Sequence, residues 1–329
     1  MTRPPTAARA IVIGSALWFC ITASIASAFA QTDYPSRPVR IVTPLAAGAA
    51  SDIVLRILAS ELSDHFNMQF VVQNQPGAAG VAADRIITNA PADGYTLGWV
   101  GNNNAVGVSL FNEAVDPRQY FRPIVGVSEF AYLFVTNASS PYKTLKDWMD
   151  AARARPNTLT IGTSSAGTSN YLAALLFKSQ QKLAVTVVPY RGPADLSVAL
   201  LRNDVDLVVN AYGGLRPQIE DGKIRPLAVT SASRLAELPG VPTMSEAGVP
   251  DYVVTSWNSL YGPKAMPDQA VDVLTRASTQ ILDDAGVKAR FREVGFEAKA
   301  LPPRELDQRM RTEIDRWAHV IADAGLEKQ

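Results

Sequence analysis

Short runs of β-branched residues alternate along this chain with longer segments of helical periodicity, and this alternation most constrains its fold. Residues 39–43 (VRIVT) have the composition of a strand, and apolar side chains recur at helical spacing over 51–66. A second strand over 70–72, a helix over 81–89 and a third strand over 96–100 follow. Since consecutive parallel strands need a crossover helix between them, this pattern predicts a parallel sheet with right-handed crossovers.

The same alternation starts again after about residue 140. Thr144 and Asp147 have the spacing of a capping pair at the start of a helix over 144–154. The elements predicted after it are strands over 159–162, 185–188, 205–209 and 227–230, helices over 170–180 and 193–202, and two long helices near 267–284 and 302–324. The chain is therefore predicted to be an α/β protein with two units and a helical tail.

The length of 329 residues is typical of two domains. We expect the chain to cross between them near 121–129 and return near 251–257, so that 31–125 plus 253–329 form one lobe and 126–252 the other. Two crossover strands would act as a hinge. The cleft between such lobes, at the carboxyl ends of parallel strands, is where small ligands bind.

The amino terminus has the order of features found in a secretory signal peptide. Arg3 and Arg9 precede an apolar stretch, and Ala28-Phe29-Ala30 matches a small-residue cleavage site. We expect residues 1–30 to be removed near Ala30 and the product to be exported to the periplasm. An uncleaved membrane anchor is the alternative, because the uncharged stretch is long enough to span a bilayer.

Composition excludes several functional classes. Lys and Arg together number 31, as do Asp and Glu, so the chain lacks the basic excess of a nucleic-acid binder. The single cysteine, Cys20, excludes a disulfide framework or a cysteine-rich zinc module. The two histidines, His65 and His319, lie far from the loops described below, and we expect neither a metal site nor a cofactor.

The loop after the first strand has the features of an anion cradle. Small side chains expose backbone N–H groups there, and the start of the next helix adds partial positive charge. Ser51 or Asp52 is the expected helix cap. The alternative is a tight turn whose small residues serve only packing. The candidate ligand-binding residues are Leu45, Ala46, Ala47, Gly48, Ala49, Ser51 and Asp52.

A second loop occupies the same position in the second unit, where a cleft would place it opposite the first. Its hydroxyls add donors for carboxylate oxygens, although a Ser/Thr-rich helix cap is the simpler alternative. Its candidate residues are Thr163, Ser164, Ser165, Ala166, Gly167 and Thr168. Tyr190, Asn210 and Trp257, which follow other strands or lie at the second crossover, are further candidates, each with a structural alternative.

Neither loop matches a known phosphate or nucleophile motif. No Gly-Lys-Ser/Thr follows either of them, and residues 77–80 (GAAG) lack the spacing of a dinucleotide-binding loop. Residues 162–166 resemble a nucleophile elbow only in part, because Ala166 stands where that motif has glycine. A serine hydrolase using Ser164 or Ser165 would also need a nearby base, so no catalytic residue is predicted.

An ordered series of short motifs resembles the Bug-type, or tripartite tricarboxylate transporter receptor, family of extracytoplasmic solute-binding proteins. The series covers the whole mature chain. It consists of 34–42 (YPSRPVRIV), 48–52 (GAASD), 74–80 (NQPGAAG), 91–97 (PADGYTL), 188–192 (VPYRG), 225–229 (RPLAV), 241–248 (VPTMSEAG), Trp257 and Pro263.

This resemblance implies a two-lobed α/β periplasmic-binding-protein fold that closes on a small dicarboxylic, tricarboxylic or aromatic acid. Residues 45–49 and 163–168 match the two loops that face the carboxylate in that family. It also implies a monomeric, non-catalytic receptor that delivers its ligand to membrane permease subunits. Use of the same fold as the sensing partner of a membrane receptor kinase is the alternative.

The chain departs from the family pattern at several positions near the cleft. Leu45 replaces a common aromatic residue and Ala49 replaces a glycine. Gln75 stands where an arginine is common, and Tyr171 where a histidine often precedes the leucine of the helix. These changes leave the fold prediction intact and leave the identity of the acid open.

Overall fold

The computed structural model describes residues 34–45, 47–76, 80–165 and 168–328. The predicted signal peptide, 1–30, lies outside the described residues. From Arg37 onward the described residues belong to one compact unit. None of its helices is long and apolar enough to cross a membrane.

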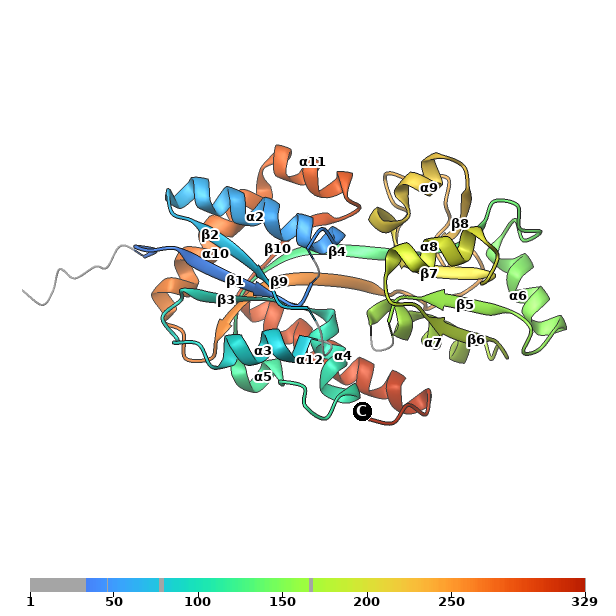
Figure 1. Ribbon diagram of the computed structural model, residues 1–329, viewed down its shortest axis with the longest axis horizontal. Coiled ribbons are helices and arrows are strands. Elements are labelled where there is room, and N and C mark those ends of the chain that lie inside the picture. Colours follow the sequence, from blue (N-terminus) through green and yellow to red (C-terminus); the bar gives the residue numbers. More distant parts are fainter. Residues whose placement is uncertain (1–33, 46, 77–79, 166–167, 329) are drawn as a thin grey trace, which may run out of the picture. The chain divides into compact units, whose positions relative to one another are not determined.

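Ten strands of the described chain form one sheet in the order β2-β1-β3-β9-β4-β7-β5-β6, with β8 and β10 both paired to β4 (Figure 1). The strands are β1 Val39–Thr43, β2 Phe70–Asn74, β3 Thr96–Gly101, β4 Phe121–Asn137, β5 Thr160–Thr163, β6 Thr186–Pro189, β7 Leu207–Ala211, β8 Ile224–Val229, β9 Thr255–Pro263 and β10 Glu297–Leu301. The helices are α2 Ala50–Phe66, α3 Val81–Thr88, α4 Asn102–Leu110, α5 Pro117–Tyr120, α6 Leu145–Ala154, α7 Ser169–Gln180, α8 Pro193–Leu201, α9 Arg216–Glu220, α10 Asp268–Asp283, α11 Ala285–Glu293 and α12 Pro303–Asp323.

The first lobe is built on the parallel strands β1, β2 and β3, with β9 antiparallel to β3 and β10 paired to β4. β1 lies between β2 and β3 and is parallel to both, which confirms the predicted β-α-β-α-β pattern. Val39, Ile41 and Val42 of β1 are fully buried. The exposed Arg40 interrupts this run, so the face of the strand that carries Val42 is buried only in part.

The second lobe is built on β5 to β8 with α6 to α9. β5 is parallel to β6 and β7, as predicted from the second alternation. The predicted capping pair also forms, since the Thr144 hydroxyl accepts from the Asp147 N–H and the Asp147 carboxylate accepts from the Thr144 N–H.

Two long antiparallel strands join the lobes (Figure 1). β4 pairs with β9 from Phe121 opposite Pro263 to Ala131 opposite Thr255, and β4 then continues into the second lobe beside β7 and β8. These are the two crossover strands expected from the sequence. The predicted lobe boundaries, after residue 125 and after residue 252, fall within β4 and shortly before β9, and they stay a prediction.

Two local expectations were wrong, and several short helices, α4 among them, were not predicted. The carboxyl-terminal region is not only helical, because β10 pairs with β4 between α11 and α12. Helix α4 was not predicted, since its sequence NNNAVGVSL contains three asparagines and a glycine, which are weak helix formers. The cap of α2 is Ala49, not Ser51 or Asp52, and no side chain caps that helix.

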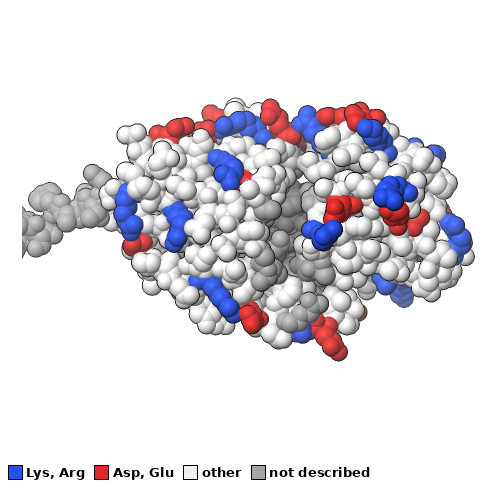
Figure 2. Space-filling model, in the orientation of Figure 1, with Lys and Arg blue, Asp and Glu red and all other residues white. Residues whose placement is uncertain are grey.

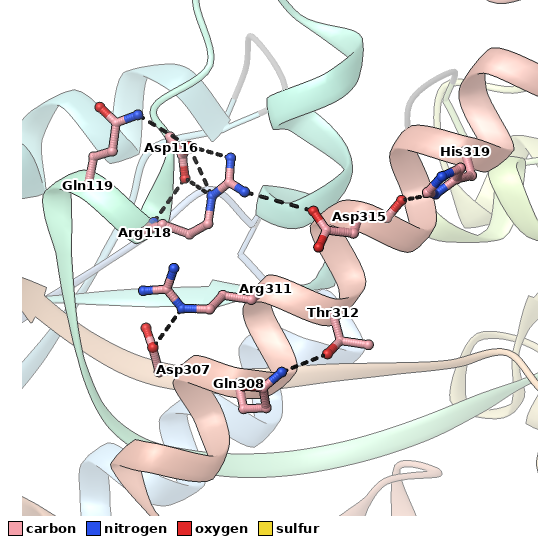
Figure 3. A network of polar contacts seen from close by, with 9 residues as sticks. All are labelled: Asp116, Arg118, Gln119, Asp307, Gln308, Arg311, Thr312, Asp315 and His319. Carbon is pink, nitrogen blue, oxygen red and sulfur yellow. Dashed lines mark hydrogen bonds and ion pairs between the residues drawn. The ribbon is translucent and has the colours of Figure 1, made fainter.

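The last helix is tied to the first lobe by a polar network (Figure 3). Asp116 caps α5 by accepting from the Arg118 N–H at 2.9 Å, and its carboxylate also binds the Arg118 guanidinium at 2.7 Å. That guanidinium lies 3.9 Å from Asp315 of α12. On the opposite face of α12, Trp317 is fully buried. The polar network and the buried indole fix α12 beside α4.

Glu129 links four elements where β4 and β9 run together. Its carboxylate accepts from the Thr255 hydroxyl at 2.7 Å, from Lys299 at 2.9 Å and from Arg309 at 3.2 Å. Burial alone raises the pKa of this carboxyl, but the three hydrogen bonds outweigh it and hold the pKa at about 2. The ionised form is therefore the one that the fold stabilises.

We predict that Glu129→Gln lowers the free energy of unfolding by about 2 kcal/mol near neutral pH, because it removes charged hydrogen bonds. A lowered pKa contributes stability that is present above the unfolded-state pKa and lost as pH falls through the folded-state pKa. The difference between the two proteins should therefore shrink as pH falls from about 5 toward 2. Urea unfolding across this range measures it. Glu113→Gln, which alters an exposed pair with Arg85, is the control, and an equal loss in both variants would contradict the prediction.

Candidate functional site

A cavity of about 210 Å³ lies between the lobes, at the carboxyl ends of β1, β3 and β7. Both crossover strands contribute to its lining. The lining residues are Pro44, Leu45, Ala49, Ala50, Ser51, Trp99, Gly101, Asn102, Asn103, Asn104, Phe130, Tyr132, Ser164, Thr168, Ser169, Asn170, Asn210, Ala211, Ser256, Trp257, Asn258 and Phe296. The cavity therefore lies at the edge of the sheet and between the lobes, where a ligand cleft was predicted.

The described lining contains no Lys, Arg, His, Asp or Glu. Its polar groups are asparagine amides and serine or threonine hydroxyls, with the tyrosine hydroxyl of Tyr132. Figure 2 shows that charged side chains of both signs are spread over the outer surface of both lobes instead. A charged ligand in this cavity would thus meet dipoles rather than formal charges.

Three helices begin at the cavity: α2 at Ala50, α4 at Asn102 and α7 at Ser169. The first-turn N–H groups of a helix lack intrahelical partners and carry partial positive charge. Neither α4 nor α7 has an acidic residue in its first turn. The arrangement gives an uncharged cavity a positive electrostatic potential, which favours an anion.

Asp52, in the first turn of α2, holds the first loop and does not line the cavity. It is fully buried, and its carboxylate accepts from the Gly48 N–H at 2.9 Å, the Arg56 side chain at 2.8 Å and the Asn74 amide at 2.7 Å. Burial raises the pKa of Asp52, but these bonds reverse that effect and leave the pKa below its usual range. Asn74 also donates to the Leu45 carbonyl at 3.0 Å, so the two side chains together fix the loop.

The second loop is held by hydrogen bonds among its own polar side chains. Asn170 donates to the Ser164 hydroxyl at 3.1 Å and to the Val209 carbonyl at 3.0 Å. The Thr168 hydroxyl contacts the Asn170 amide oxygen at 2.6 Å. The Thr163 hydroxyl donates to the Ser164 carbonyl, and Thr163 itself is fully buried.

The predicted site residues divide into three groups. Those that line the cavity are Leu45, Ala49, Ser51, Ser164, Thr168, Asn210 and Trp257. Those placed outside the lining are Ala47, Gly48, Asp52, Thr163, Ser165 and Tyr190. Tyr190 instead borders a separate surface hollow with Arg191 and Asp195. Ala46, Ala166 and Gly167 lie outside the described residues, and ligand contact by any member of the set stays a prediction.

The start of α4, the third helix start at the cavity, was not predicted from the sequence. Three asparagines directly follow Gly101, the last residue of β3, and the carboxyl end of β3 lies at the same edge as that of β1. A run of three asparagines at that position is a signal that could have indicated the site. Phe130 and Tyr132 of β4 were also missed, because they lie within an apolar strand pattern that gave no such signal.

The lobes touch directly beside the cavity at the starts of α4 and α7. Asn102 donates its amide N–H to the Ser169 hydroxyl at 3.0 Å, and that hydroxyl donates to the Asn103 amide oxygen at 2.8 Å. The indole of Trp317 fixes Asn102 from the other side by donating to its amide oxygen at 2.9 Å. We call these contacts the asparagine clasp.

A second contact between the lobes involves backbone rather than side chains. A Cβ on Gly213, which follows β7, would lie 2.1 Å from the Val294 carbonyl oxygen, before β10. Arg216 of α9 donates to the Glu293 carbonyl in the same place at 2.5 Å. We call these contacts the glycine contact. Like the asparagine clasp, it joins residues of the two lobes.

Three buried donors belong to residues of the lining. They are the indole N–H groups of Trp99 and Trp257 and the Asn210 amide, and none has an acceptor in the described part of the chain. Buried donors are rarely left without a partner. Ligands rich in hydrogen-bond acceptors therefore fit this lining better than ligands rich in hydrogen-bond donors.

Asp84 lies behind the lining and orients one of its asparagines. Both of its carboxylate oxygens accept from the Asn104 amide at 3.0 Å, and the Asn104 amide oxygen accepts from the Gly101 N–H at 3.0 Å. Burial raises the pKa of Asp84 to about 7, which the Asn104 bond only partly offsets. A carboxyl thus fixes the start of α4 without contacting the cavity.

We predict that stability falls as pH rises from about 4 to 7 because of Asp84. Its raised pKa means that the folded state binds the proton more tightly than the unfolded state, so ionisation is penalised by folding. Asp84→Asn should raise the free energy of unfolding near neutral pH by an amount on the order of 3 kcal/mol. It should leave the free energy of unfolding near pH 4 unchanged. Chemical unfolding of both proteins at several pH values tests this. The exposed Asp64→Asn is the matched control, and a pH-independent difference for Asp84→Asn would refute the assignment.

Comparison with known proteins places this geometry in one family. The model of the Tripartite tricarboxylate transporter family receptor matches residues 54–326. The chain belongs to this family. The resemblance inferred from its motifs is thereby confirmed.

Relatives of this receptor family match along nearly the whole chain. Protein BugT of Bordetella pertussis is 29% identical over 310 residues, 93% of this chain and 95% of its own length. The "UPF0065 protein in the TAR-I ttuE-ttuC' intergenic region" of Agrobacterium vitis is 32% identical over 300 residues, 90% of this chain and 87% of its own.

Solved structures with the same fold also match along nearly the whole chain. One described as R. palustris Rpa4515 with adipate has a TM-score of 0.83 and 32% identity, and covers 90% of this chain and 100% of its own. Another, MatC (Rpa3494) from Rhodopseudomonas palustris with bound malate, has a TM-score of 0.77 and 28% identity, and covers 88% and 100%.

Proposed function

We propose that this protein is a periplasmic receptor that captures a small carboxylate between its lobes and delivers it to a permease of the tripartite tricarboxylate type. The uncharged interlobe cavity at three helix starts is the observation that carries the proposal. Two similar receptors, described with adipate and with malate, support a carboxylate as the ligand. The predicted signal peptide and the family description support export and a permease partner.

The carboxylate is bound by dipoles in this mechanism. Its oxygens accept hydrogen bonds from first-turn N–H groups of α2 and α7 and from hydroxyls such as those of Ser51 and Ser164. Since these donors belong to different lobes, the full set is assembled only when the lobes close. The ligand therefore stabilises the closed form through its greater affinity for it, and β4 and β9 bend as the hinge.

No residue of the described lining offers a base for hydrolysis. Ser164 lines the cavity beside an asparagine, and both histidines are exposed and lie outside the lining. Membership of a receptor family agrees with the expected non-catalytic function.

Direct binding is the first test. Isothermal titration calorimetry of the exported protein with mono-, di- and tricarboxylates should find at least one acid with a micromolar or lower dissociation constant, about −8 kcal/mol or better. The corresponding neutral amide should not bind, because it lacks the charge that the helix starts favour. Equal binding of an acid and its amide would argue against an anion site.

The glycine contact provides a test of closure. Gly213→Ala adds a methyl group where the Val294 carbonyl lies 2.1 Å away, so the lobes should be held apart and carboxylate affinity should fall about tenfold or more. Each lobe keeps its own packing, so unfolding stability should change little. Small-angle scattering should show that ligand no longer compacts the variant.

Gly192→Ala is the matched control for this variant. Nothing lies within 4 Å of a Cβ at Gly192, and the residue is outside the lobe contact. Unchanged affinity and unchanged ligand-induced compaction in Gly213→Ala would show that the glycine contact is not part of closure.

A further inference from the structure

Asp84 is a buried acidic side chain behind the cavity lining that lacks a cation. It lies on α3, is 5% exposed, and both of its carboxylate oxygens accept from the Asn104 amide at 3.0 Å. In the described part of the chain no Lys, Arg or His side chain forms an ion pair with it. Asp52, by contrast, is paired with Arg56 at 2.8 Å. The negative charge of an ionised Asp84 is therefore not neutralised by its surroundings.

Asn104 connects this carboxyl to the start of α4. The Asn104 amide oxygen accepts from the Gly101 N–H at 3.0 Å, and both residues line the cavity. α3 and α4 lie side by side in the first lobe (Figure 1). When Asp84 is ionised, its charge offsets the partial positive charge of the first-turn N–H groups of α4. When Asp84 is protonated, that positive potential is left to a bound anion.

A bound anion and an ionised Asp84 therefore disfavour each other. Asn104, which separates Asp84 from the cavity, is itself buried, and like charges in such a region are screened less than at the surface. Burial already raises the pKa of Asp84 to about 7, so the carboxyl can take up a proton near neutral pH. An anion in the cavity raises this pKa further, because it adds a second negative charge.

The other charged or titratable side chains around Asp84 are held elsewhere or stay neutral. Arg85, its neighbour on α3, is exposed and pairs with Glu113 at 2.7 Å. β3 and α4 contain no charged residue. Arg40 of β1 is exposed and donates to side chains of its own sheet. Tyr261 of β9 is buried, and burial raises its pKa, so it stays neutral near pH 7.

We propose, building on the function proposed above, that Asp84 takes up a proton when this receptor binds its carboxylate, so that affinity rises as pH falls from about 8 to about 6. The proton comes from the solvent and returns to it when the ligand leaves. Asp84 is thus a positioning residue that acts through Asn104 and does not touch the ligand. The linkage is reciprocal, because an anion that prefers the protonated form must also strengthen proton binding.

Calorimetry of the exported wild-type protein tests this with adipate, malate and benzoate, which are almost fully ionised above pH 6. For an acid that binds, the dissociation constant should be at least about threefold lower at pH 6 than at pH 8. At pH 7, binding heats in two buffers with different heats of ionisation should show uptake of about a third of a proton or more. Equal affinity at both pH values without proton uptake would overturn the inference while the carboxylate receptor stands. If none of the three acids binds at either pH, both proposals fail.

A neutral variant assigns the proton to its site. Asp84→Asn keeps the shape of the side chain but cannot titrate, so it should bind about as tightly at pH 8 as at pH 6 and take up no proton. Asp84→Ser gives a second reading should the first variant fold poorly. Glu313→Gln is the matched control, because Glu313 of α12 is another acid whose pKa is raised by burial, and it lies outside the lining. Proton uptake that survives in both Asp84 variants, or that is lost in Glu313→Gln, would overturn the assignment to Asp84.

The histidines are the second control, because histidine is the residue type that most often titrates near neutral pH. His65 and His319 are both exposed and lie outside the described lining. The double variant His65→Gln, His319→Gln should therefore keep the proton uptake and the pH dependence of the dissociation constant. Loss of either property in this variant would contradict the assignment to Asp84.

Discussion

The antiparallel pairing of β4 with β9 is the constraint on which the rest of the structure depends. β4 runs through both lobes, β9 begins where the chain returns to the first, and the two strands provide the cavity with Phe130, Tyr132, Ser256, Trp257 and Asn258. Any change in the angle between the lobes must therefore alter the backbone that lies against the ligand. The proposed hinge and the cavity wall share these strands, and Glu129, which joins β4 to β9, β10 and α12, lies where they run together.

The electrostatic character of the cavity depends on the surroundings of the two acidic side chains nearest to it. Asp52 and Asp84 are both almost completely buried and both act by orienting a loop or an amide. Asp52 has a cation, Arg56, and stays ionised with a lowered pKa, whereas Asp84 has only the Asn104 amide and its pKa rises to about 7. Each carboxyl is separated from the cavity by the groups that it holds. The helix dipoles at the lining are thus left without a competing negative charge in contact with the ligand.

Much of this architecture could be predicted from sequence because its signals are local. The β-α-β-α-β pattern and the loops after β1 and β5 each depend on residues adjacent in the chain, and Leu45, Ser51, Ser164 and Thr168 reach the cavity as a consequence. The prediction that Asp52 caps α2 was wrong because its partners come from Gly48, Arg56 and Asn74, and Asn74 lies 22 residues away. Asp84, which orients Asn104, lies 20 residues before it on another helix, and no local sequence pattern indicates this contact.

The contacts between the lobes lie further beyond local signals, and the two contacts differ in kind. The asparagine clasp joins residues 66 and 67 positions apart through side chains that exchange hydrogen bonds, so it can open and rebind water without leaving a buried group unpaired. The glycine contact instead depends on the absence of a side chain at Gly213, whose backbone meets the Val294 carbonyl. A polar clasp tolerates small changes in the angle between lobes, whereas a steric contact between backbones sets a limit that cannot be passed. In the proposed mechanism the glycine contact therefore limits closure, and the asparagine clasp holds the closed form.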